Sequence, residues 1–408
     1  MLGLDGDAAV KTYAAGTDRV LPPAETVARA RALAPAMGVT RVANVTGLDH
    51  IGIPVVTVCR PNSRSLAVFQ GKGLTLDAAR ASGLMEAIEA FHAERIEAPL
   101  YLASYQDLRL RRRVVDADRL PRLETSTFHH GRELLWIDAV DLVAGGPVAV
   151  PFELVHLNYR LPLPSGSGAF YISSNGLASG NHPLEAISHG LCELVERDAL
   201  TLRGLRGEEA KERTRLDLAS VDDPRARALL DCFARAQVAV LAWEVTTDIR
   251  LPAFLCTIMD QEDSGRVLPP ISGSGCHPRR AVALARALTE AAQARLTMIS
   301  GSRDDLGHRV YSEARERRAA ALARLVAARP QRRFAEVPTF ESDDLRADVE
   351  HELQALAAVG LGQVLVVDLT RPGIGLPVVR VVIPGLEGTA DLSGYLPGER
   401  ARRAFAGG

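Results

Sequence analysis

The chain contains little cysteine, few aromatic residues and almost no lysine. Its 408 residues include five cysteines that form no CxxC pair, so neither a disulfide framework nor a zinc-binding cysteine motif is expected. Aromatic residues make up 5% of the sequence, which argues against stacking platforms for single-stranded nucleic acid. Lysine occurs only as Lys11, Lys72 and Lys211, and arginine supplies the other basic side chains.

An excess of one charge and long apolar runs are also missing. The chain has 48 basic and 50 acidic residues, a net charge of −2, so it lacks the basic surplus of proteins that bind nucleic acid. No stretch approaches the roughly 18 apolar residues of a membrane span, and the N-terminal sequence MLGLDGDAAVKTY lacks the apolar core of a secretory signal. We therefore expect a soluble, cytoplasmic protein that neither binds nucleic acid nor crosses a membrane.

Strand-like and helix-like segments alternate along the chain. Turn-bounded apolar segments predict strands at 41–48, 52–60, 65–70, 134–143, 147–157, 239–246, 252–260, 362–370 and 376–384. Periodicity predicts long helices from Leu74 to about Glu97, from Pro183 to about Leu205 and from Pro278 to about Ile299, and a helical stretch at 313–333. We expect a mixed α/β (α+β) fold in a single domain over residues 1–408, with possible lobes at about 1–205 and 206–408.

Each of the three long helices carries polar side chains on one stripe. On the first and third helices these residues are spaced i, i+4 and i+7, which places them on one face. They are Ser82, Glu86 and Glu89 on the first helix; Glu185, Glu193, Glu196 and Arg197 on the second, with Asn181 just ahead of it; and Arg286, Glu290 and Gln293 on the third. A solvated face of an amphipathic helix is the simpler interpretation of any one stripe.

Two details favour ligand binding over a solvated face. The first stripe is flanked by Ala79 and Ala93, and all three helices are otherwise rich in Ala, Leu and Ile, as buried helices are. Carboxylates buried together need compensating cations at neutral pH, and hard oxygen ligands select Mg²⁺. Lys72, Arg197 and Arg286 would then meet an anion that those metals bridge. If the stripes converge, the sequence predicts a magnesium–polyphosphate site.

Familiar nucleotide-binding loops are absent from the sequence. GKG at 71–73 lacks both the earlier glycine and the following Ser or Thr of a P-loop, and GIG at 373–375 is too short for a dinucleotide fingerprint. If ATP binds, it does so through the carboxylates and cations of the helices.

The three helix motifs together resemble those of the YcaO superfamily. SGLMEAIE at 82–89 matches its SxxxExxE element, NHPLEAISHGLCELVER at 181–197 matches its Asn-led stretch ending in ExxER, and RALTE at 286–290 matches its RxxxE element. RVANVTGLDHIGIPVVTVCRPNSRS with QGKG, and later GSGCHP with SGSRDD, resemble the branch that works with TfuA-type partner proteins. This resemblance implies a YcaO-type fold, with long helices packed on sheets around a central ATP and magnesium site.

The resemblance also implies a chemistry. Members of the family use ATP and Mg²⁺ to phosphorylate a peptide backbone amide on oxygen, and in the TfuA-associated branch sulfide then gives a thioamide. The implied partners are a TfuA-like protein, a ribosomally synthesised precursor peptide and a sulfide source, and the implied assembly is a homodimer. The alternatives are an azoline- or amidine-forming cyclodehydratase and, in another class, a non-catalytic nucleotide-binding adaptor. Azoline formers often carry a PxPxP tail, whereas this chain ends GERARRAFAGG.

Residue roles follow from the same resemblance. The magnesium ligands, direct or through water, would be Glu86, Glu89, Glu185, Glu193 and Glu196. ATP would contact Lys72, Ser82, Asn181, Arg197, Arg286, Glu290 and Gln293, and the catalytic set would be Glu86, Glu89, Glu196, Arg197 and Arg286. Lys11 would reach the phosphates if the N-terminal segment folds over the site. His189 and Cys192 are predicted to be packing residues, and Cys276 a small loop residue.

Overall fold

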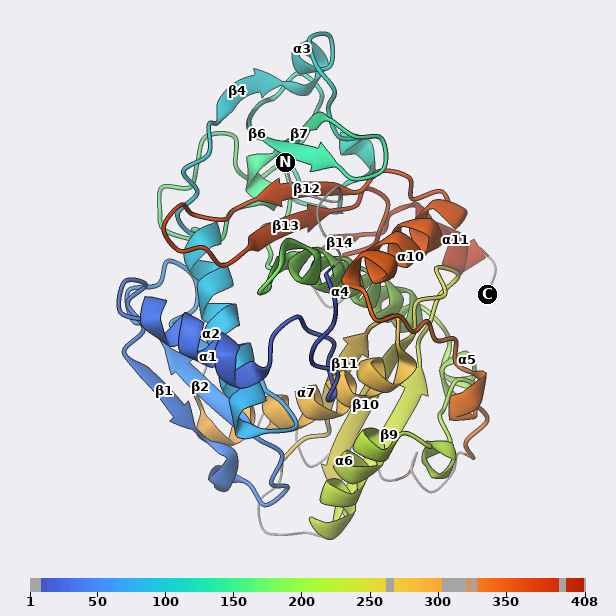
Figure 1. The fold of residues 1–408 in the computed structure, drawn as a ribbon. Coiled ribbons are helices and arrows are strands. Elements are labelled where there is room, and N and C mark those ends of the chain that lie inside the picture. The colour runs from blue at the N-terminus through green and yellow to red at the C-terminus, as the bar shows by residue number, and fades with distance from the viewer. Residues whose placement is uncertain are drawn as a thin grey trace.

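The computed structural model describes residues 9–261, 268–302, 321, 323, 329–388 and 394–406. They form helices packed on antiparallel sheets (Figure 1), which confirms the mixed fold expected from the sequence. The largest sheet has six strands in the order β4–β6–β12–β13–β8, with β7 paired to β6. Its strands are β4 (Tyr101–Ser104), β6 (Glu133–Asp141), β7 (Pro147–Pro151), β8 (Leu177–Ser179), β12 (Leu365–Asp368) and β13 (Val378–Val382).

Three smaller sheets are also present among the described residues. Two of them have three strands, in the orders β1–β2–β3 and β11–β10–β9, and the third pairs β14 with β5. The strands are β1 (Arg41–Asn44), β2 (Val55–Cys59), β3 (Val68–Lys72), β5 (Arg122–Leu123), β9 (Val238–Glu244), β10 (Ala253–Asp260), β11 (Ile271–Cys276) and β14 (Tyr395–Leu396).

Each of the three larger sheets is covered by one long helix. Helix α2 (Leu76–Ala93) packs on β2 and β3, α4 (Pro183–Gly204) packs on β8 and β13, and α7 (Arg280–Ser300) packs on β10 and β11. Local sequence explains where two of these helices begin: the Thr75 side chain caps α2, and Pro183 occupies the first turn of α4. All three predicted long helices are therefore confirmed, although α2 ends at Ala93 instead of Glu97.

The other helices among the described residues are shorter. They are α1 (Pro23–Leu33), α3 (Tyr105–Leu108), α5 (Glu208–Glu212), α6 (Pro224–Arg235), α10 (Leu345–Ala358) and α11 (Glu399–Ala406). Single 3₁₀ turns lie at Thr46–Leu48, Ala117–Arg119, Phe152–Leu154, Leu218–Ser220 and Phe334–Glu336. The turn at Phe152–Leu154 cuts short the strand expected over 147–157. Of the helical stretch predicted at 313–333, residues 313–320, 322 and 324–328 lie outside the described residues.

Glycines allow two of the long helices to lie directly on their strands. A Cβ atom added at Gly273 would lie 2.2 Å from the Ala291 nitrogen, and one at Gly275 would lie 2.3 Å from the Ala283 oxygen. At Gly71 on β3 the same atom would lie 2.0 Å from the Ala79 oxygen of α2. Only glycine fits such contacts, and these glycines bring α2 and α7 into the close packing that their small residues suggested.

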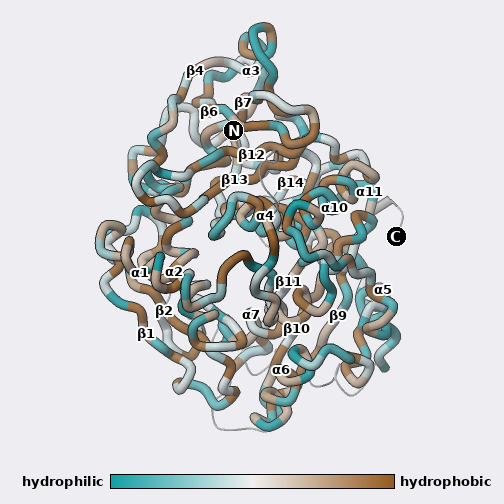
Figure 2. The backbone as a smooth tube through the Cα atoms, viewed as in Figure 1, coloured by the Kyte–Doolittle hydropathy of each residue, from teal (hydrophilic) through white to brown (hydrophobic). Residues whose placement is uncertain are grey.

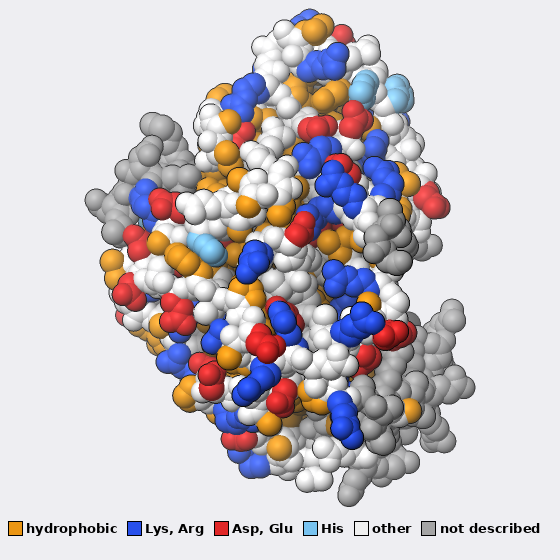
Figure 3. Space-filling view, turned by 90° about the vertical axis from the view of Figure 1, so that its right-hand side faces the viewer, with side chains coloured by type: hydrophobic (Ala, Val, Ile, Leu, Met, Phe, Trp, Pro, Cys, Tyr) orange, Lys and Arg blue, Asp and Glu red, His pale blue; other side chains and the backbone are white. Residues whose placement is uncertain are grey.

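Hydrophobic residues fill the interior while charges cover the outside. Figure 2 shows a mostly hydrophobic chain along β12 and β13 and hydrophilic stretches in α5 and α10. Figure 3 shows basic and acidic side chains interspersed over the right-hand face of the molecule, in keeping with the net charge of −2. Among the described residues, no helix combines the length and the apolar character that crossing a membrane would demand.

Candidate active site

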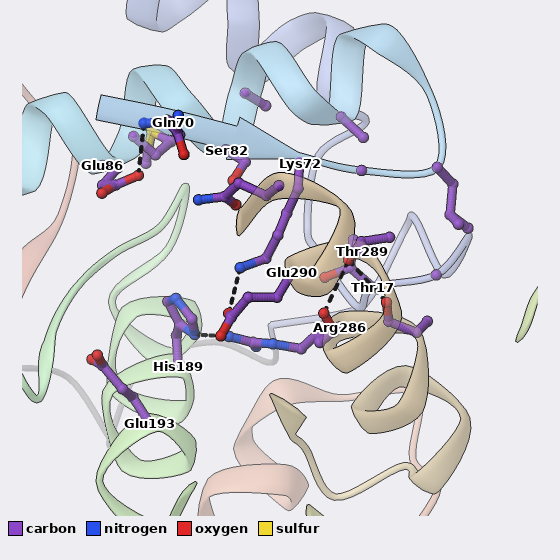
Figure 4. A pocket seen from close by; sticks show the side chains of 18 of the residues that line it. Thr17, Gln70, Lys72, Ser82, Glu86, His189, Glu193, Arg286, Thr289 and Glu290 are labelled. Atoms are coloured by element: carbon purple, nitrogen blue, oxygen red, sulfur yellow. Dashed lines mark hydrogen bonds and ion pairs between the residues drawn. The ribbon is translucent and has the colours of Figure 1, made fainter. Parts of the chain in front are cut away.

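A cavity of about 760 Å³ lies between α2, α4 and α7. The three polar stripes converge on it, which is the condition on which the sequence interpretation depended (Figure 4). All twelve residues predicted for the site line its wall, namely Lys72, Ser82, Glu86, Glu89, Asn181, Glu185, Glu193, Glu196, Arg197, Arg286, Glu290 and Gln293. A solvated face is therefore the wrong interpretation for these stripes.

The N-terminal segment also reaches the cavity. In Figure 1 this dark blue segment crosses the centre of the molecule, and Thr17 and Arg19 line the cavity wall. The Val20 N–H donates to Glu185 Oε1 at 2.5 Å, and the other carboxylate oxygen of Glu185 accepts from the Asn181 N–H at 2.7 Å. Sequence periodicity could not identify Thr17 and Arg19, because they lie in an irregular segment.

Lys11 does not reach the cavity, although its segment folds over the site as the prediction required. Its Nζ lies 2.5 Å from Asp348 and 3.3 Å from Asp18, and it donates to the Ser342 carbonyl at 2.9 Å. The expectation that Lys11 contacts phosphates is therefore wrong in this structure. Buried carboxylates behind the segment hold the ammonium group instead, so Lys11 fixes the segment in place.

Two carboxylates in the cavity have raised pKa values, although one of them, Glu193, lies 3.9 Å from Arg197 Nη2. Burial raises the pKa of Glu89 to about 8, with smaller contributions from Glu86 and Glu193, although Ser179 Oγ donates to it at 2.7 Å. Burial also raises the pKa of Glu193, which accepts a hydrogen bond from the Gly176 N–H at 3.0 Å. The buried Arg380 on β13 donates to the Asn175 carbonyl at 2.6 Å and so supports the loop that carries Gly176.

The other side of the cavity pairs its carboxylates with cations. Lys72 Nζ lies 2.6 Å from Glu290 Oε2, and Arg197 lies 3.4 Å from Glu196. Burial acts to raise the pKa of Glu290, but Lys72 and Arg197 hold that pKa well below its usual range. Ser274 Oγ on β11 donates to Glu196 at 2.7 Å. Lys72 and Arg197 thus pair with carboxylates on this side of the cavity, whereas burial dominates the pKa of Glu89.

His189 is a cavity residue that sequence reasoning assigned to packing. It lies on α4 midway between Glu185 and Glu193, and its Nδ1 is 2.9 Å from Arg286 Nη2 (Figure 4). The prediction of a packing role is therefore wrong for His189. The spacing of four residues to each glutamate was the available signal, because it places His189 on the same stripe. Cys192 is buried as predicted, and Cys276 is also buried, at the end of β11 and not in a loop.

The sequence matches a known family over most of its length. A family model described as YcaO cyclodehydratase, ATP- and Mg²⁺-binding, matches residues 70–387, which include all twelve predicted site residues. The chain belongs to the YcaO family. Members of this family are ATP-dependent enzymes that modify peptides.

Two relatives in sequence extend the match towards both ends of the chain. This YcaO protein is 40% identical over 385 residues to a Rhizobium leguminosarum bv. trifolii protein whose name places it in the tfuA 3′ region, covering 92% of this chain and 90% of that one. It is 36% identical over 358 residues to a protein of Methanothermobacter thermautotrophicus, covering 86% and 90%. The name of the Rhizobium relative confirms the resemblance to a protein of the tfuA neighbourhood.

Solved YcaO structures share the fold. A heterocyclase described as in complex with substrate and cofactor superposes with a TM-score of 0.75 at 25% identity, over 93% of this chain. This chain spans about half, 54%, of the length of that heterocyclase. A YcaO protein from Methanopyrus kandleri, described as bound with AMPPCP and Mg²⁺, superposes with a TM-score of 0.72 at 24% identity, over 93% of this chain and 94% of that one.

ATP and Mg²⁺ are therefore the cofactors of this YcaO protein, as the sequence resemblance implied. No three His, Cys, Asp or Glu side chains among the described residues are arranged as a ready-made metal cage. Proteins commonly hold Mg²⁺ through one or two carboxylates together with nucleotide phosphates and water. Burial raises the pKa of Glu89, and a bound cation would favour its ionised form.

Magnesium binding to this YcaO protein should release a proton. Because the pKa of Glu89 is about 8, the carboxyl group is protonated at lower pH and must ionise before it can bind a cation. The affinity for Mg²⁺ in the presence of AMPPCP is expected to rise with pH and to level off above about 8. Calorimetry in buffers of different ionisation enthalpy measures the protons released.

The Glu89→Gln variant is the control, because AMPPCP itself also titrates. The difference in released protons between the native protein and this variant belongs to Glu89. An equal release from both would show that Glu89 is not a magnesium ligand.

Proposed function

We propose that this YcaO protein converts a backbone amide of a ribosomally synthesised peptide into a thioamide, with a TfuA-like protein as partner. The observation that carries the proposal is the convergence of six glutamates and four cations on one cavity of about 760 Å³. Such a cavity suits a polyphosphate held by Mg²⁺, and transfer of a phosphoryl group depends mainly on positioning and electrostatic stabilisation.

The proposed reaction has two steps. In the first, the amide oxygen attacks the γ-phosphorus of ATP, the bond to the β-phosphate oxygen breaks, and ADP leaves. In the second, hydrosulfide adds to the carbon of the phosphorylated amide, and phosphate leaves with the former amide oxygen. The sulfhydryl proton is lost, and a thioamide, ADP and phosphate remain. Phosphorylation is necessary because the unmodified amide oxygen is a very poor leaving group.

The cavity residues of this chain are proposed to bind either the metal ions or the nucleotide. Mg²⁺, when bound, neutralises charge on the transferring phosphoryl group. We propose that Glu86, Glu89, Glu193 and Glu196 hold the metal ions directly or through water, and that Glu185 orients the segment around Val20. We propose that Lys72, Arg197, Arg286 and Arg19 contact the phosphates, while Ser82, Asn181, Glu290 and Gln293 contact or position the nucleotide.

One observation favours a thioamide over an azoline. The relative named for the tfuA 3′ region supports a TfuA-like partner, with which thioamide formation is associated.

Mass spectrometry of the peptide product tests the proposal. The protein, the TfuA-like partner, a candidate precursor peptide, ATP, Mg²⁺ and sulfide are expected to give a peptide in which sulfur replaces one oxygen. With ¹⁸O in the backbone amide, the label should appear in the released phosphate. Loss of water from the peptide would instead indicate the azoline alternative. ATP binding without any peptide-dependent turnover would indicate the adaptor alternative.

The assembly stays a prediction. A homodimer is implied by the family resemblance, and light scattering of the purified protein, alone and with the TfuA-like partner, measures it directly.

A further inference from the structure

His189 is a cavity residue whose hydrogen-bond partner fixes the protonation of its ring. Its Nδ1 lies 2.9 Å from Arg286 Nη2, a hydrogen bond that joins α4 to α7 across the cavity wall (Figure 4). A guanidinium group donates hydrogen bonds and cannot accept them. Nδ1 must therefore be the acceptor, which means that it carries no proton while this contact is made.

The second ring nitrogen follows from the first. A neutral imidazole with an unprotonated Nδ1 carries its proton on Nε2. His189 lines the cavity, and among the described residues no hydrogen bond of Nε2 accompanies the contact of Nδ1 with Arg286. The ring thus accepts from Arg286 through Nδ1 and carries its N–H on Nε2.

The charges around the ring keep it neutral. Burial, followed by Arg286, Arg19, Lys72 and the neighbouring His277, lowers the pKa of His189 well below its usual range. A protonated ring would place a further positive charge among these cations and would lose its acceptor for Arg286. The contact with Arg286 and the surrounding positive charges therefore both favour the neutral ring, with its proton on Nε2.

We propose that His189 is a positioning residue for phosphoryl transfer: its Nδ1 holds the Arg286 guanidinium towards the nucleotide phosphates, and its Nε2–H is a fixed neutral donor. This inference rests on the phosphoryl-transfer step of the proposed function and not on the identity of the nucleophile. It also means that His189 is not the base that deprotonates sulfide, because Nε2 already carries a proton.

Arginine is a residue for which such support matters. Its long side chain has many rotamers, and an acceptor that holds the guanidinium reduces the ordering that must occur when the phosphates bind. The orienting role of a neighbour is general in catalytic sites, where a reacting or charge-stabilising group is held by residues around it.

Substitutions at His189 test the proposal through enzyme kinetics. The His189→Leu variant is expected to lower kcat of peptide-dependent ATP turnover by about 10- to 100-fold, the loss that removing a hydrogen bond to a charged group produces. The His189→Asn variant keeps an acceptor near the position of Nδ1 and is expected to restore most of the activity. The matched control is His182→Asn, at the N-cap of α4 and outside the cavity lining, where asparagine also caps well.

A double-mutant cycle separates positioning from a general structural role. In an Arg286→Gln background, His189→Leu is expected to change kcat by less than about threefold, because the residue that it holds is gone. An equal loss in both backgrounds would overturn the proposal. Thermal unfolding of each variant shows whether the helices still pack.

Nitrogen NMR tests the tautomer in the unaltered protein. With ¹⁵N-labelled histidine and bound Mg²⁺–AMPPCP, the signal that disappears in His189→Leu is expected to show the proton on Nε2. A proton on Nδ1, or on both nitrogens, would overturn the assignment. This measurement does not require a peptide or turnover, so failure of the proposed function and failure of this inference are distinguishable.

Discussion

Peptide-dependent ATP turnover is expected to fall by about 100- to 1000-fold when Glu196 is replaced by Gln, the range seen when one charge-stabilising group is removed from an active site. The side chain of Glu196 is only 5% exposed, and its carboxylate accepts from Ser274 Oγ at 2.7 Å. Glutamine has the same shape and can still accept from Ser274. The substitution therefore removes one negative charge from the cavity with little effect on packing.

The position of Glu196 explains the size of this effect. Arg197 Nη2 lies 3.4 Å from Glu196 Oε1, so the carboxylate, a proposed metal ligand, also restrains a cation that is proposed to contact phosphate. Without its charge, Mg²⁺ would lose one of the proposed ligands and Arg197 would lose an ion-pair partner. We expect the Mg²⁺ concentration for half-maximal turnover to rise together with the fall in kcat.

A surface glutamate provides the control. Glu209 on α5 is 84% exposed and pairs with Arg213 at 2.6 Å, so Glu209→Gln makes the same chemical change away from the cavity. Its turnover should match that of the native protein. Unchanged turnover in Glu196→Gln would remove Glu196 from the catalytic set.

Replacing Lys72 with Met is expected to lower kcat/KM for ATP by about 100-fold, with most of the loss in KM. Lys72 Nζ is 2.6 Å from Glu290 and its side chain is 22% exposed, so the ammonium group lies at the cavity surface. Hydrogen bonds between charged partners contribute about 1.5–3 kcal/mol each, and the variant loses contacts to Glu290 and to the nucleotide phosphates. It also leaves Glu290 beside those phosphates without its cation.

The scarcity of lysine makes a second measurement simple. Because the chain has only three lysines, acetylation of each side chain can be followed by mass spectrometry. Mg²⁺–AMPPCP is expected to protect Lys72, whereas Lys211, which pairs with Glu208 on α5, should react equally with and without nucleotide. Lys211→Met is the matched control for activity. Equal acetylation of Lys72 in both conditions would contradict a contact with phosphate.

The positions of the long helices and of the acidic stripes could be predicted from sequence. For example, helical spacing places Ser82, Glu86 and Glu89 on one face of α2. That placement does not depend on how the helices are arranged in space. The family motifs then identified the three helices as parts of one site. Convergence itself could not be derived from spacing, because it depends on glycines such as Gly273 and Gly275, which allow α7 to lie on β11.

What remained hidden were features that arise only from tertiary contacts. Arg19 lies in an irregular segment, and His189 looks like a packing residue until Arg286 is placed beside it. Strands β8 and β11 were missed because their glycine and serine content is typical of loops, although in β11 it serves close packing. For Lys11 the sequence predicted a contact that the structure does not have. Its ammonium group is buried with Asp18 and Asp348 and is therefore not available to bind phosphate.

The N-terminal segment has a consequence for the order in which the chain folds. Lys11 is synthesised among the first residues, yet it is anchored by Ser342, which lies 331 positions later. Loop closure over such a separation is slow and comes late, so Thr17 and Arg19 can take their places on the cavity wall only when nearly the whole chain is available. By mass action, ATP bound to the cavity that these residues complete is expected to stabilise the fully folded molecule.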